Sequence, residues 1–367
     1  MHIEKLYIVN FKSFKSATLE LKKGINCITG ENGTGKTNLL DALYYLSFCK
    51  SYFNNIDSQN INDSEDFFLI KGRYHNHGQT EYLSCSLKRG EKKVFKKNDK
   101  AYQRLADHIG HFPLVIISPS DADYINAGSD MRRKYIDSAL SQFDKRYLDN
   151  LLNYNKALQQ RNILLKQFYE RNYFDNAALE IWDNKLVMLG QKIYDTRHEF
   201  LKSYIPVFQD FHKRLSGNKE PVSVAYESQL KDSDYALKLK DAVGKDRQAL
   251  HTTVGIHKDD LIFNIADKPL KKFGSQGQQK TFLIALKLAQ YMIIKNIKKQ
   301  TPLLLLDDIF DKLDNNRVEH LIKLVNEEGF EQIIITDTDY LRLQKTLEQI
   351  HLKATYFLIK DRCARQL

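Results

Sequence analysis

Residues 30–37, near the start of the chain, constrain its fold more than any other segment. They read Gly-Glu-Asn-Gly-Thr-Gly-Lys-Thr and follow the apolar run 25–29, while residues 38–43 open a helical pattern. A strand, a glycine-rich turn and a helix in that order are the context of a phosphate-binding loop, or P-loop. A glycine-rich turn that arises by chance is the plain alternative, and the flanking strand and helix disfavour it. The chain is therefore predicted to be an α/β protein that binds a nucleoside triphosphate.

Each part of the P-loop has a predicted contact with ATP. Its glycines let backbone N–H groups turn towards the phosphates, and the N-terminus of the following helix attracts the same anions. Lys36 is predicted to bridge the β- and γ-phosphates, as a catalytic residue, and the Thr37 hydroxyl to bind Mg²⁺. The predicted nucleotide-binding residues of the loop are Gly30, Glu31, Asn32, Gly33, Thr34, Gly35, Lys36, Thr37 and Asn38.

A leucine-rich strand at 303–306 ends in two acids, Asp307 and Asp308. Asp307 is predicted to hold Mg²⁺ through water. Asp308, which as the next strand residue should face the other way, is predicted to polarise the attacking water as a catalytic residue. By itself, such a pair is more often a strand end that enters solvent. A P-loop in the same chain favours the functional interpretation.

The segment Gly274-Ser275-Gln276-Gly277-Gln278 precedes a helix whose apolar residues share one face, and we call it the signature segment. The first N–H groups of a helix and its dipole attract anions. Ser275, Gly277 and Gln278 are therefore predicted to contact a γ-phosphate. Taken alone, the segment fits an ordinary helix with Ser275 as its N-cap. Together with the P-loop and the two acids, it predicts that two copies of the protein hold ATP between them.

The chain divides into three segments by pattern. Residues 1–118 are predicted to form the N-terminal part of an ATPase lobe, with a small antiparallel sheet over 67–95. Residues 119–297 are predicted to form a helical lobe with two short antiparallel helices that turn near 172–176. Residues 298–367 are predicted to complete the ATPase lobe. The helix pair is predicted from residues that recur every seven positions, namely Leu151, Leu158 and Leu165, then Leu179, Leu186, Ile193 and Phe200.

Composition narrows the partner and the compartment. The formal net charge of +10 and the pI of about 9.1 favour polyanions, nucleic acid among them. The four cysteines form no C-x-x-C pair, so neither a zinc site nor a disulfide framework is indicated. No apolar run reaches the ~20 residues that cross a bilayer, and the N-terminus lacks the order of a signal peptide. We expect a cytoplasmic protein without a membrane partner.

The motifs together resemble a known family. The P-loop, the signature segment and the Asp307-Asp308 strand are similar to the ABC-type ATPase heads of the SMC group. More specifically, the chain resembles the RecF family of bacterial DNA replication and repair proteins. The supporting stretches extend from residue 3 to about residue 340, and they include 10–14, 33–42, 131–137, 157–162 and 254–261.

The resemblance implies a fold and a mechanism. The fold is α/β, with an ABC-type P-loop ATPase lobe built on a mixed or parallel sheet and a helical second lobe that carries the signature segment. Two monomers would pair head to tail around ATP and close over DNA near a junction of single-stranded and duplex DNA. In this family, weak DNA-stimulated hydrolysis releases the clamp, and RecO and RecR help to place a recombinase on gapped DNA. The loop 310–314 would contact the partner subunit.

The sequence departs from related ATPases at several positions. Gln276 stands where transporter ATPases have glycine, which is the RecF-like form. Thr336-Asp337-Thr338 has no histidine where transporter ATPases place a γ-phosphate sensor. Residues 50–53 lack the arginine that many relatives carry there. Residues 256–260 carry isoleucine and lysine in place of proline and arginine, and the sequence assigns this segment no chemistry.

Basic runs are the candidates for contacts with DNA. Such runs are usually solvated faces. No helix-turn-helix, zinc finger or aromatic stacking platform is indicated, so we expect binding to the phosphate backbone with a strong dependence on salt. The candidates are Lys88, Arg89, Lys92, Lys93, Lys96 and Lys97 on a predicted hairpin tip, with Arg132 and Arg133.

Three other functions stay open from the sequence. The first is the ATPase subunit of a transporter, which the helical insertion, the ~240 residues between P-loop and signature helix and the missing histidine disfavour. The second is a P-loop kinase or metabolic transferase, which needs no signature helix and acts as a monomer without DNA. The third is a scaffold that binds ATP and does not hydrolyse it.

Overall fold

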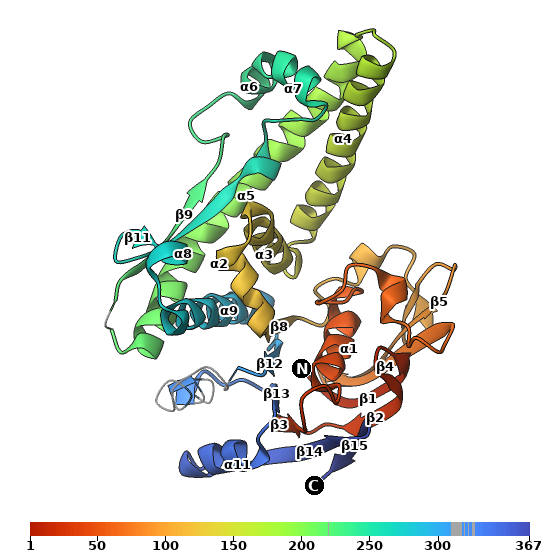
Figure 1. The fold of residues 1–367 in the computed structure, drawn as a ribbon, viewed down its shortest axis with the longest axis vertical. Coiled ribbons are helices and arrows are strands. Elements are labelled where there is room, and N and C mark those ends of the chain that lie inside the picture. Colours follow the sequence, from red (N-terminus) through yellow and green to blue (C-terminus); the bar gives the residue numbers. More distant parts are fainter. Residues whose placement is uncertain (219, 310–317, 319, 322, 325–326) are drawn as a thin grey trace. The chain divides into compact units, whose positions relative to one another are not determined.

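The structure is a computed structural model of the chain that describes residues 1–367 except 219, 310–317, 319, 322 and 325–326. The chain folds into two compact units (Figure 1). Unit 1 comprises Met1–Ala122, Phe211–Asn218 and Gln276–Leu367. Unit 2 comprises Asp123–Asp210 and Lys219–Ser275.

A mostly parallel sheet in unit 1 carries the ends of the ATP motifs. Its strand order is β15-β14-β3-β13-β12-β8, and only the edge strand β15 pairs antiparallel. The strands are β3 (Gly24–Thr29), β8 (Leu114–Ile117), β12 (Leu303–Asp307), β13 (Gln332–Asp337), β14 (Ala354–Lys360) and β15 (Cys363–Gln366). Parallel strands end at one edge, so the segments after β3, β8, β12 and β13 gather there. Open α/β sheets bind ligands at this edge.

An antiparallel sheet, also in unit 1, has the order β2-β1-β4-β5-β6-β7. Its strands are β1 (His2–Phe11), β2 (Phe14–Glu20), β4 (Phe67–Asn76), β5 (Gln79–Lys88), β6 (Val94–Lys97) and β7 (Lys100–Ala101). Side chains alternate between its faces: Leu83 and Cys85 of β5 are buried, whereas Tyr82 and Lys88 are exposed. The antiparallel sheet predicted over 67–95 is therefore present, and β1 and β2 extend it.

The helices of unit 1 differ slightly from expectation. Those that the structure describes completely are α1 (Lys36–Phe48), η1 (Asp57–Asn60), η2 (Leu105–Asp107), η3 (Pro119–Ala122), α9 (Gln276–Lys298) and α11 (Tyr340–Gln349). Helix α1 begins at Lys36, two residues before the start that the sequence pattern indicates. The reason is that Gly35, with a φ angle of 106°, ends the loop, so that the last P-loop residues form the first helical turn.

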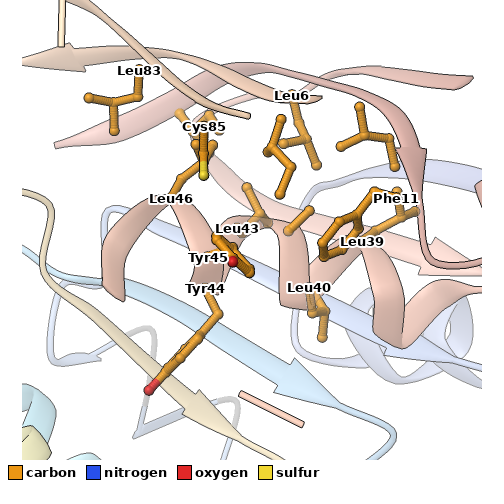
Figure 2. Packing of buried hydrophobic residues seen from close by; sticks show 14 of the residues in the cluster. Leu6, Phe11, Leu39, Leu40, Leu43, Tyr44, Tyr45, Leu46, Leu83 and Cys85 are labelled. Carbon is orange, nitrogen blue, oxygen red and sulfur yellow. The ribbon is translucent and has the colours of Figure 1, made fainter. Parts of the chain in front are cut away.

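The core of unit 1 forms around α1, which contacts strands of both sheets and is buried along most of its length. Figure 2 shows Leu39 and Leu43 on the side of α1 that faces Leu6 and Phe11 of β1, while Tyr44 points away from β1. The residues of this cluster are buried in the core. Because apolar burial stabilises the fold by ~25 cal/mol per Å², this packing holds the P-loop at the sheet edge.

Unit 2 is mainly helical and contains a sheet that the sequence patterns do not predict. Its helices are α2 (Asp123–Asn126), α3 (Ser129–Ser141), α4 (Lys145–Glu170), α5 (Asn176–Ser216, whose end belongs to unit 1), α6 (Tyr235–Asp241), α7 (Val243–Ala249), η4 (Ile256–Lys258) and α8 (Leu270–Phe273). The sheet has the order β11-β10-β9, with β9 (Val222–Glu227), β10 (Asp260–Ile265) and β11 (Lys268–Pro269). Strands β9 and β10 have six residues each, and β10 alternates between buried and partly exposed positions, a strand signal inside the segment that was assigned to the helical lobe.

Helices α4 and α5 form the antiparallel pair that the heptads predict. Arg161 of α4 pairs with Asp183 of α5 at 2.5 Å, while Tyr147, earlier on α4, accepts a hydrogen bond from Arg197, later on α5, at 3.0 Å. A late residue of α4 thus contacts an early residue of α5, and an early residue of α4 contacts a later one of α5. The two helices therefore run in opposite directions. Helix α5, with 41 residues, is longer than expected.

The buried faces of the two helices match the heptads unequally. All four predicted positions on α5 are buried, namely Leu179, Leu186, Ile193 and Phe200. On α4, Leu165 is buried, but Leu151 and Leu158 are only partly covered. On the side of α4 that faces the interior, Tyr154 and Arg161 are fully buried instead. Arg161 can be buried there because it forms ion pairs in the interior of unit 2.

The units differ from the expected lobes at the C-terminal boundary and at Phe211–Asn218, which belong to unit 1. Unit 1 gives way to unit 2 after Ala122, near the expected boundary at 118/119, but unit 2 ends at Ser275 rather than 297. Helix α9 groups with the ATPase unit because it packs on β8 and η3. None of the helices described has the length and apolar character to span a membrane.

Candidate nucleotide site

The P-loop connects the end of β3 to the start of α1. Gly30, Gly33 and Gly35 have φ angles of 153°, 81° and 106°, which strain any residue with a side chain. A Cβ atom on Gly35 would lie 2.6 Å from the ring of Phe14, and one on Gly30 would lie 2.5 Å from the carbonyl oxygen of Ile359. Both the backbone conformation and the close approach of β2 and β14 therefore require glycine.

Lys36 lies inside the loop that it follows. Its side chain is buried, and its Nζ donates to the carbonyl oxygens of Gly30 at 2.7 Å and Glu31 at 2.9 Å. The first turn of α1 contains no acidic residue. A helix N-terminus carries a partial positive charge, and here no acidic side chain of that turn offsets it. The loop and the start of α1 thus form an anion-binding environment.

Asp307, at the end of β12, is held by hydroxyl groups from three other segments. Its Oδ1 accepts hydrogen bonds from Thr37 at 3.0 Å and from Thr336 at 2.8 Å, and its Oδ2 accepts one from Ser118 at 3.4 Å. Burial raises the pKa of Asp307, while the hydrogen bonds from Thr336 and Thr37 oppose that shift. The result is a fixed carboxylate beside the first turn of α1.

Asp308 does not continue the strand. Its φ angle is 48°, and its N–H group donates to the carbonyl oxygen and the hydroxyl of Thr336 at 3.2 and 3.0 Å. Strand alternation predicts that Asp307 and Asp308 point to opposite sides. The left-handed conformation at Asp308 changes this geometry, and both residues line the same cavity.

That cavity brings the two motifs together. Its volume is about 200 Å³, and its lining residues are Asn32, Gly33, Gly35, Lys36, Thr37, Asn38, Asp307 and Asp308. Gly30, Glu31 and Thr34, which were also predicted to bind nucleotide, are not part of this lining among the described residues. The Thr34 hydroxyl instead donates to the carbonyl oxygen of Glu31 at 2.8 Å and closes the loop on itself.

Along the sequence, the signature segment contains the point at which unit 2 ends and unit 1 resumes. Ser275 is the last residue of unit 2, and α9 begins at Gln276, so Gly277 and Gln278 lie in its first turn. Gly277 and Gln278 belong to unit 1, as the cavity does, but neither they nor Ser275 are among the described residues that line it. The loop 310–314, expected to contact a partner subunit, lies outside the described residues.

Known proteins are similar in sequence to this chain over nearly its whole length. The family model described as "RecF/RecN/SMC N terminal domain" matches residues 2–108. The DNA replication and repair protein RecF of Flavobacterium johnsoniae is 48% identical over 351 residues, which cover 96% of this chain and 98% of that protein. The protein of the same name from Phocaeicola vulgatus is 48% identical over 363 residues, or 98% of this chain and 97% of that protein. The chain belongs to the RecF family.

Solved structures agree with this RecF assignment. The recombination mediator protein RecF-ATP of the RecFOR pathway superposes with a TM-score of 0.89 at 29% identity, over 100% of this chain and 97% of that one. An Smc head bound to the C-terminal winged-helix domain of ScpA gives a TM-score of 0.58 at 15% identity, over 100% and 97%. The second likeness concerns the fold alone. The predicted α/β fold of an ABC-type ATPase head is confirmed.

Two polar partners of Asp307 in this RecF-family site, Ser118 and Thr336, do not follow from the sequence motifs. Both follow from topology, because β8 and β13 are the strands that pair with β12 on either side. A hydroxyl residue at the end of each neighbouring strand is the signal that identifies them.

The basic run of this RecF-family chain forms a hairpin between β5 and β6, as predicted, and its charges divide into two groups. Lys88, Arg89, Lys92 and Lys96 are exposed. Lys93 is held inside unit 1, where its Nζ lies 2.6 Å from Asp57 and donates to Tyr45 and to the Cys49 carbonyl. Lys97 forms an ion pair with Glu81.

The two arginines predicted to contact DNA have partners within unit 2. Arg132 forms a bidentate ion pair with Asp260 at 2.6 and 2.8 Å. Arg133 donates at 2.6 Å to the Ser129 hydroxyl and at 2.6 Å to the carbonyl oxygen of Asp259. A phosphate would have to displace these partners, and also Glu91, which pairs with Lys88 at 3.0 Å, so the exposed Lys92 and Lys96 are the stronger candidates.

Proposed function

We propose that this RecF-family protein is an ATP-dependent DNA clamp of recombinational repair and replication in the cytoplasm. The main support for this proposal is that the P-loop and the acids Asp307 and Asp308 line one cavity. Relatives of 48% identity, which are named DNA replication and repair proteins, support it. Two copies would dimerise on ATP at junctions of single-stranded and duplex DNA. With RecO and RecR, they would help to load a recombinase onto gapped DNA.

The ATP phosphates would bind at the P-loop. Lys36 would exchange its bonds to the carbonyl oxygens of Gly30 and Glu31 for the β- and γ-phosphates. Because the Lys36 ammonium already lies at the loop, only its side chain has to turn. The N-terminus of α1 would favour the same anions.

Thr37 and Asp307 are the residues that would hold Mg²⁺. Their oxygen atoms lie 3.0 Å apart, and hydroxyl and carboxylate oxygens suit this ion. In the described part of the chain, no group of three or more His, Cys, Asp or Glu residues is placed to hold a metal. Mg²⁺ commonly binds through one or two protein oxygens and takes its other ligands from phosphates and water. Bound here, it would neutralise phosphate charge.

Hydrolysis and dimer release would depend on Asp308 and the signature segment. Asp308 lines the cavity next to Asp307 and would orient the attacking water. Ser275, Gly277 and Gln278 of a second copy would contact the γ-phosphate. If ATP binds between two copies, dimer affinity is linked to nucleotide occupancy and falls after hydrolysis. A weak ATPase would then act as a timer.

The outer face of the antiparallel sheet is the surface that would meet DNA. Lys71 of β4, Ser84 of β5 and Lys96 of β6 are direct cross-strand partners, so their side chains share one face. At a strand spacing of ~4.8 Å, the two lysine positions are on the order of 10 Å apart. Tyr7 and Lys71 line a hollow of about 360 Å³ on this face. Such a face suits phosphate contacts without base recognition.

The test is retention of gapped duplex DNA with and without ATP. ATP should strengthen binding by wild type about tenfold or more, within the usual range of coupling between two ligands. Lys36→Met should remain at the nucleotide-free level, because it removes the ammonium that binds the phosphates. Lys166→Met, which changes an exposed lysine on α4, should behave as wild type. Equal affinity of wild type for DNA with and without ATP would contradict the clamp.

A further inference from the structure

Unit 1 contains a buried ion pair that no step described above uses. Lys287 of α9 and Asp121 of η3 lie 2.9 Å apart, and their side chains are 4% and 1% exposed. Burial lowers the pKa of Lys287, and the charge of Asp121 opposes that shift. Removing two charges from water is unfavourable unless further hydrogen bonds satisfy them. The contacts around the pair therefore show how these two buried charges are satisfied.

Asp121 connects three segments of unit 1. Its Oδ1 accepts a hydrogen bond from the hydroxyl of Tyr52, which follows α1, in addition to the ion pair with Lys287. Its Oδ2 accepts from the backbone N–H of Ser118 at 2.8 Å. Lys287 also donates to the Tyr52 hydroxyl at 3.3 Å. One carboxylate thus ties α9 to the residue that follows β8.

Ser118 continues the series into the nucleotide site. Its backbone is fixed by Asp121, and its hydroxyl contacts Asp307 at 3.4 Å. Asp307 in turn accepts from Thr37 in the first turn of α1. Lys287 lies 11 residues after the first residue of α9, which is about 16 Å along the helix. An unbroken set of polar contacts therefore joins the helix of the signature segment to the carboxylate next to the P-loop.

We propose that Lys287 and Asp121 are positioning residues for Asp307 and Ser118, and that they link the placement of α9 to the metal-binding geometry. The proposal rests on the proposed function. It explains why a charged pair lies in the core, where an apolar pair of similar volume often gives equal or greater stability. A shift of α9 moves Lys287, and Asp121 transmits the shift to Ser118 and thus to Asp307.

The experiment compares nucleotide affinity in Mg²⁺ and in EDTA for wild type, Lys287→Met and Lys287→Arg. Residues that orient metal ligands typically change metal affinity or activity 10-fold to 100-fold when they are substituted. Lys287→Met should lose roughly that factor of the Mg²⁺-dependent gain in ATP affinity and keep its affinity in EDTA. Lys287→Arg, which keeps the charge, should retain most of the gain. A wild-type Mg²⁺ gain in folded Lys287→Met would overturn the proposal.

Matched variants separate this role from loss of stability. Arg161→Met removes the buried cation of another ion pair, in unit 2, and should keep the full Mg²⁺ gain. If Lys287→Met does not fold, Tyr52→Phe decides, because it deletes only the hydroxyl that donates to Asp121. Its control is Tyr45→Phe, which deletes a hydroxyl that donates to Asp57.

The outcomes distinguish the two proposals. A reduced Mg²⁺ gain in Tyr52→Phe, with a full gain in Tyr45→Phe, supports the positioning role. Equal gains in both variants overturn it. Absence of ATP binding by wild type in either solution would overturn the proposed function, and the positioning role with it.

Discussion

Asp307, a proposed Mg²⁺ ligand, accepts hydrogen bonds from three hydroxyl groups. If the Thr37 hydroxyl turned to Mg²⁺, Thr336 and Ser118 would still donate to the two carboxylate oxygens. The carboxylate would therefore keep its orientation while one of its partners changed. Hydrogen bonds of this kind around a ligand residue are as much part of a metal site as the ligand itself.

At the residue scale, we expect ATP hydrolysis to depend on Asp308, and the variant Asp308→Asn tests this. The amide keeps the size of the side chain but cannot accept a proton from water, so ATP hydrolysis should fall by about 100-fold or more. ATP binding should persist, and dimers should accumulate. Steady-state hydrolysis and nucleotide binding are measured side by side. Asp267→Asn, at an exposed turn with a φ angle of 59°, is the control that should leave both unchanged. An unchanged hydrolysis rate in Asp308→Asn would favour a scaffold that does not use this acid.

At the scale of elements, the segment 256–260, to which the sequence assigns no chemistry, connects β10 to the helix pair of unit 2. His257 contacts the Tyr154 hydroxyl through Nδ1 at 2.9 Å, and burial lowers the pKa of His257 to about 4. Asp259 pairs with the buried Arg197 at 3.0 Å. These bonds fix the start of β10 against the helix pair. Removing one partner of such a buried pair typically destabilises a protein by about 3–5 kcal/mol.

We expect the face formed by β4, β5 and β6 to bind DNA through Lys71 and Lys96. Lys71→Ala combined with Lys96→Ala should weaken DNA binding and reduce the slope of log affinity against log salt by about 2, because each phosphate contact contributes ~0.9. The pair Lys166→Ala and Lys202→Ala changes two exposed lysines of unit 2 and is the control. Titrations at several salt concentrations supply the slopes. An unchanged slope in the Lys71 and Lys96 variant would exclude this face as the DNA surface.

The sequence predicts the elements that have long or unusual patterns. The P-loop, the leucine-rich β12, the heptads of α5 and the hairpin at 88–97 are all where the patterns indicate. The small sheet of unit 2 was not predicted, because β9 and β10 lie inside the segment assigned to the helical lobe. The buried positions Tyr154 and Arg161 of α4 were not predicted either, because Arg161 is buried through ion pairs. No local pattern reports such partners, since they lie far away in the sequence.

The same limit applies to the site. The P-loop and the two acids follow from motifs, but their common cavity depends on the turn at Asp308, which strand alternation does not predict. Ser118 and Thr336 become visible only when β8 and β13 are known to flank β12. Parallel pairing joins strands far apart in the chain, so these contacts follow from topology rather than from a motif.

At the scale of the whole molecule, the proposed clamp depends on the linkage between ATP binding and dimerisation. Each copy has one P-loop cavity and one signature segment, and a head-to-tail pair would use both from each copy. A ligand that binds only the dimer stabilises it by mass action. Without that linkage, hydrolysis would have no means to release DNA.

The most direct measurement is the molar mass in solution with and without ATP, for wild type and Ser275→Arg. The mass of wild type should double from 42.9 kDa when ATP is added. Ser275→Arg should stay at 42.9 kDa and still bind ATP, because the larger cationic side chain blocks only the contact from the second copy. A wild-type mass that does not change with ATP would contradict the account, because the signature segment would then be only the start of an ordinary helix.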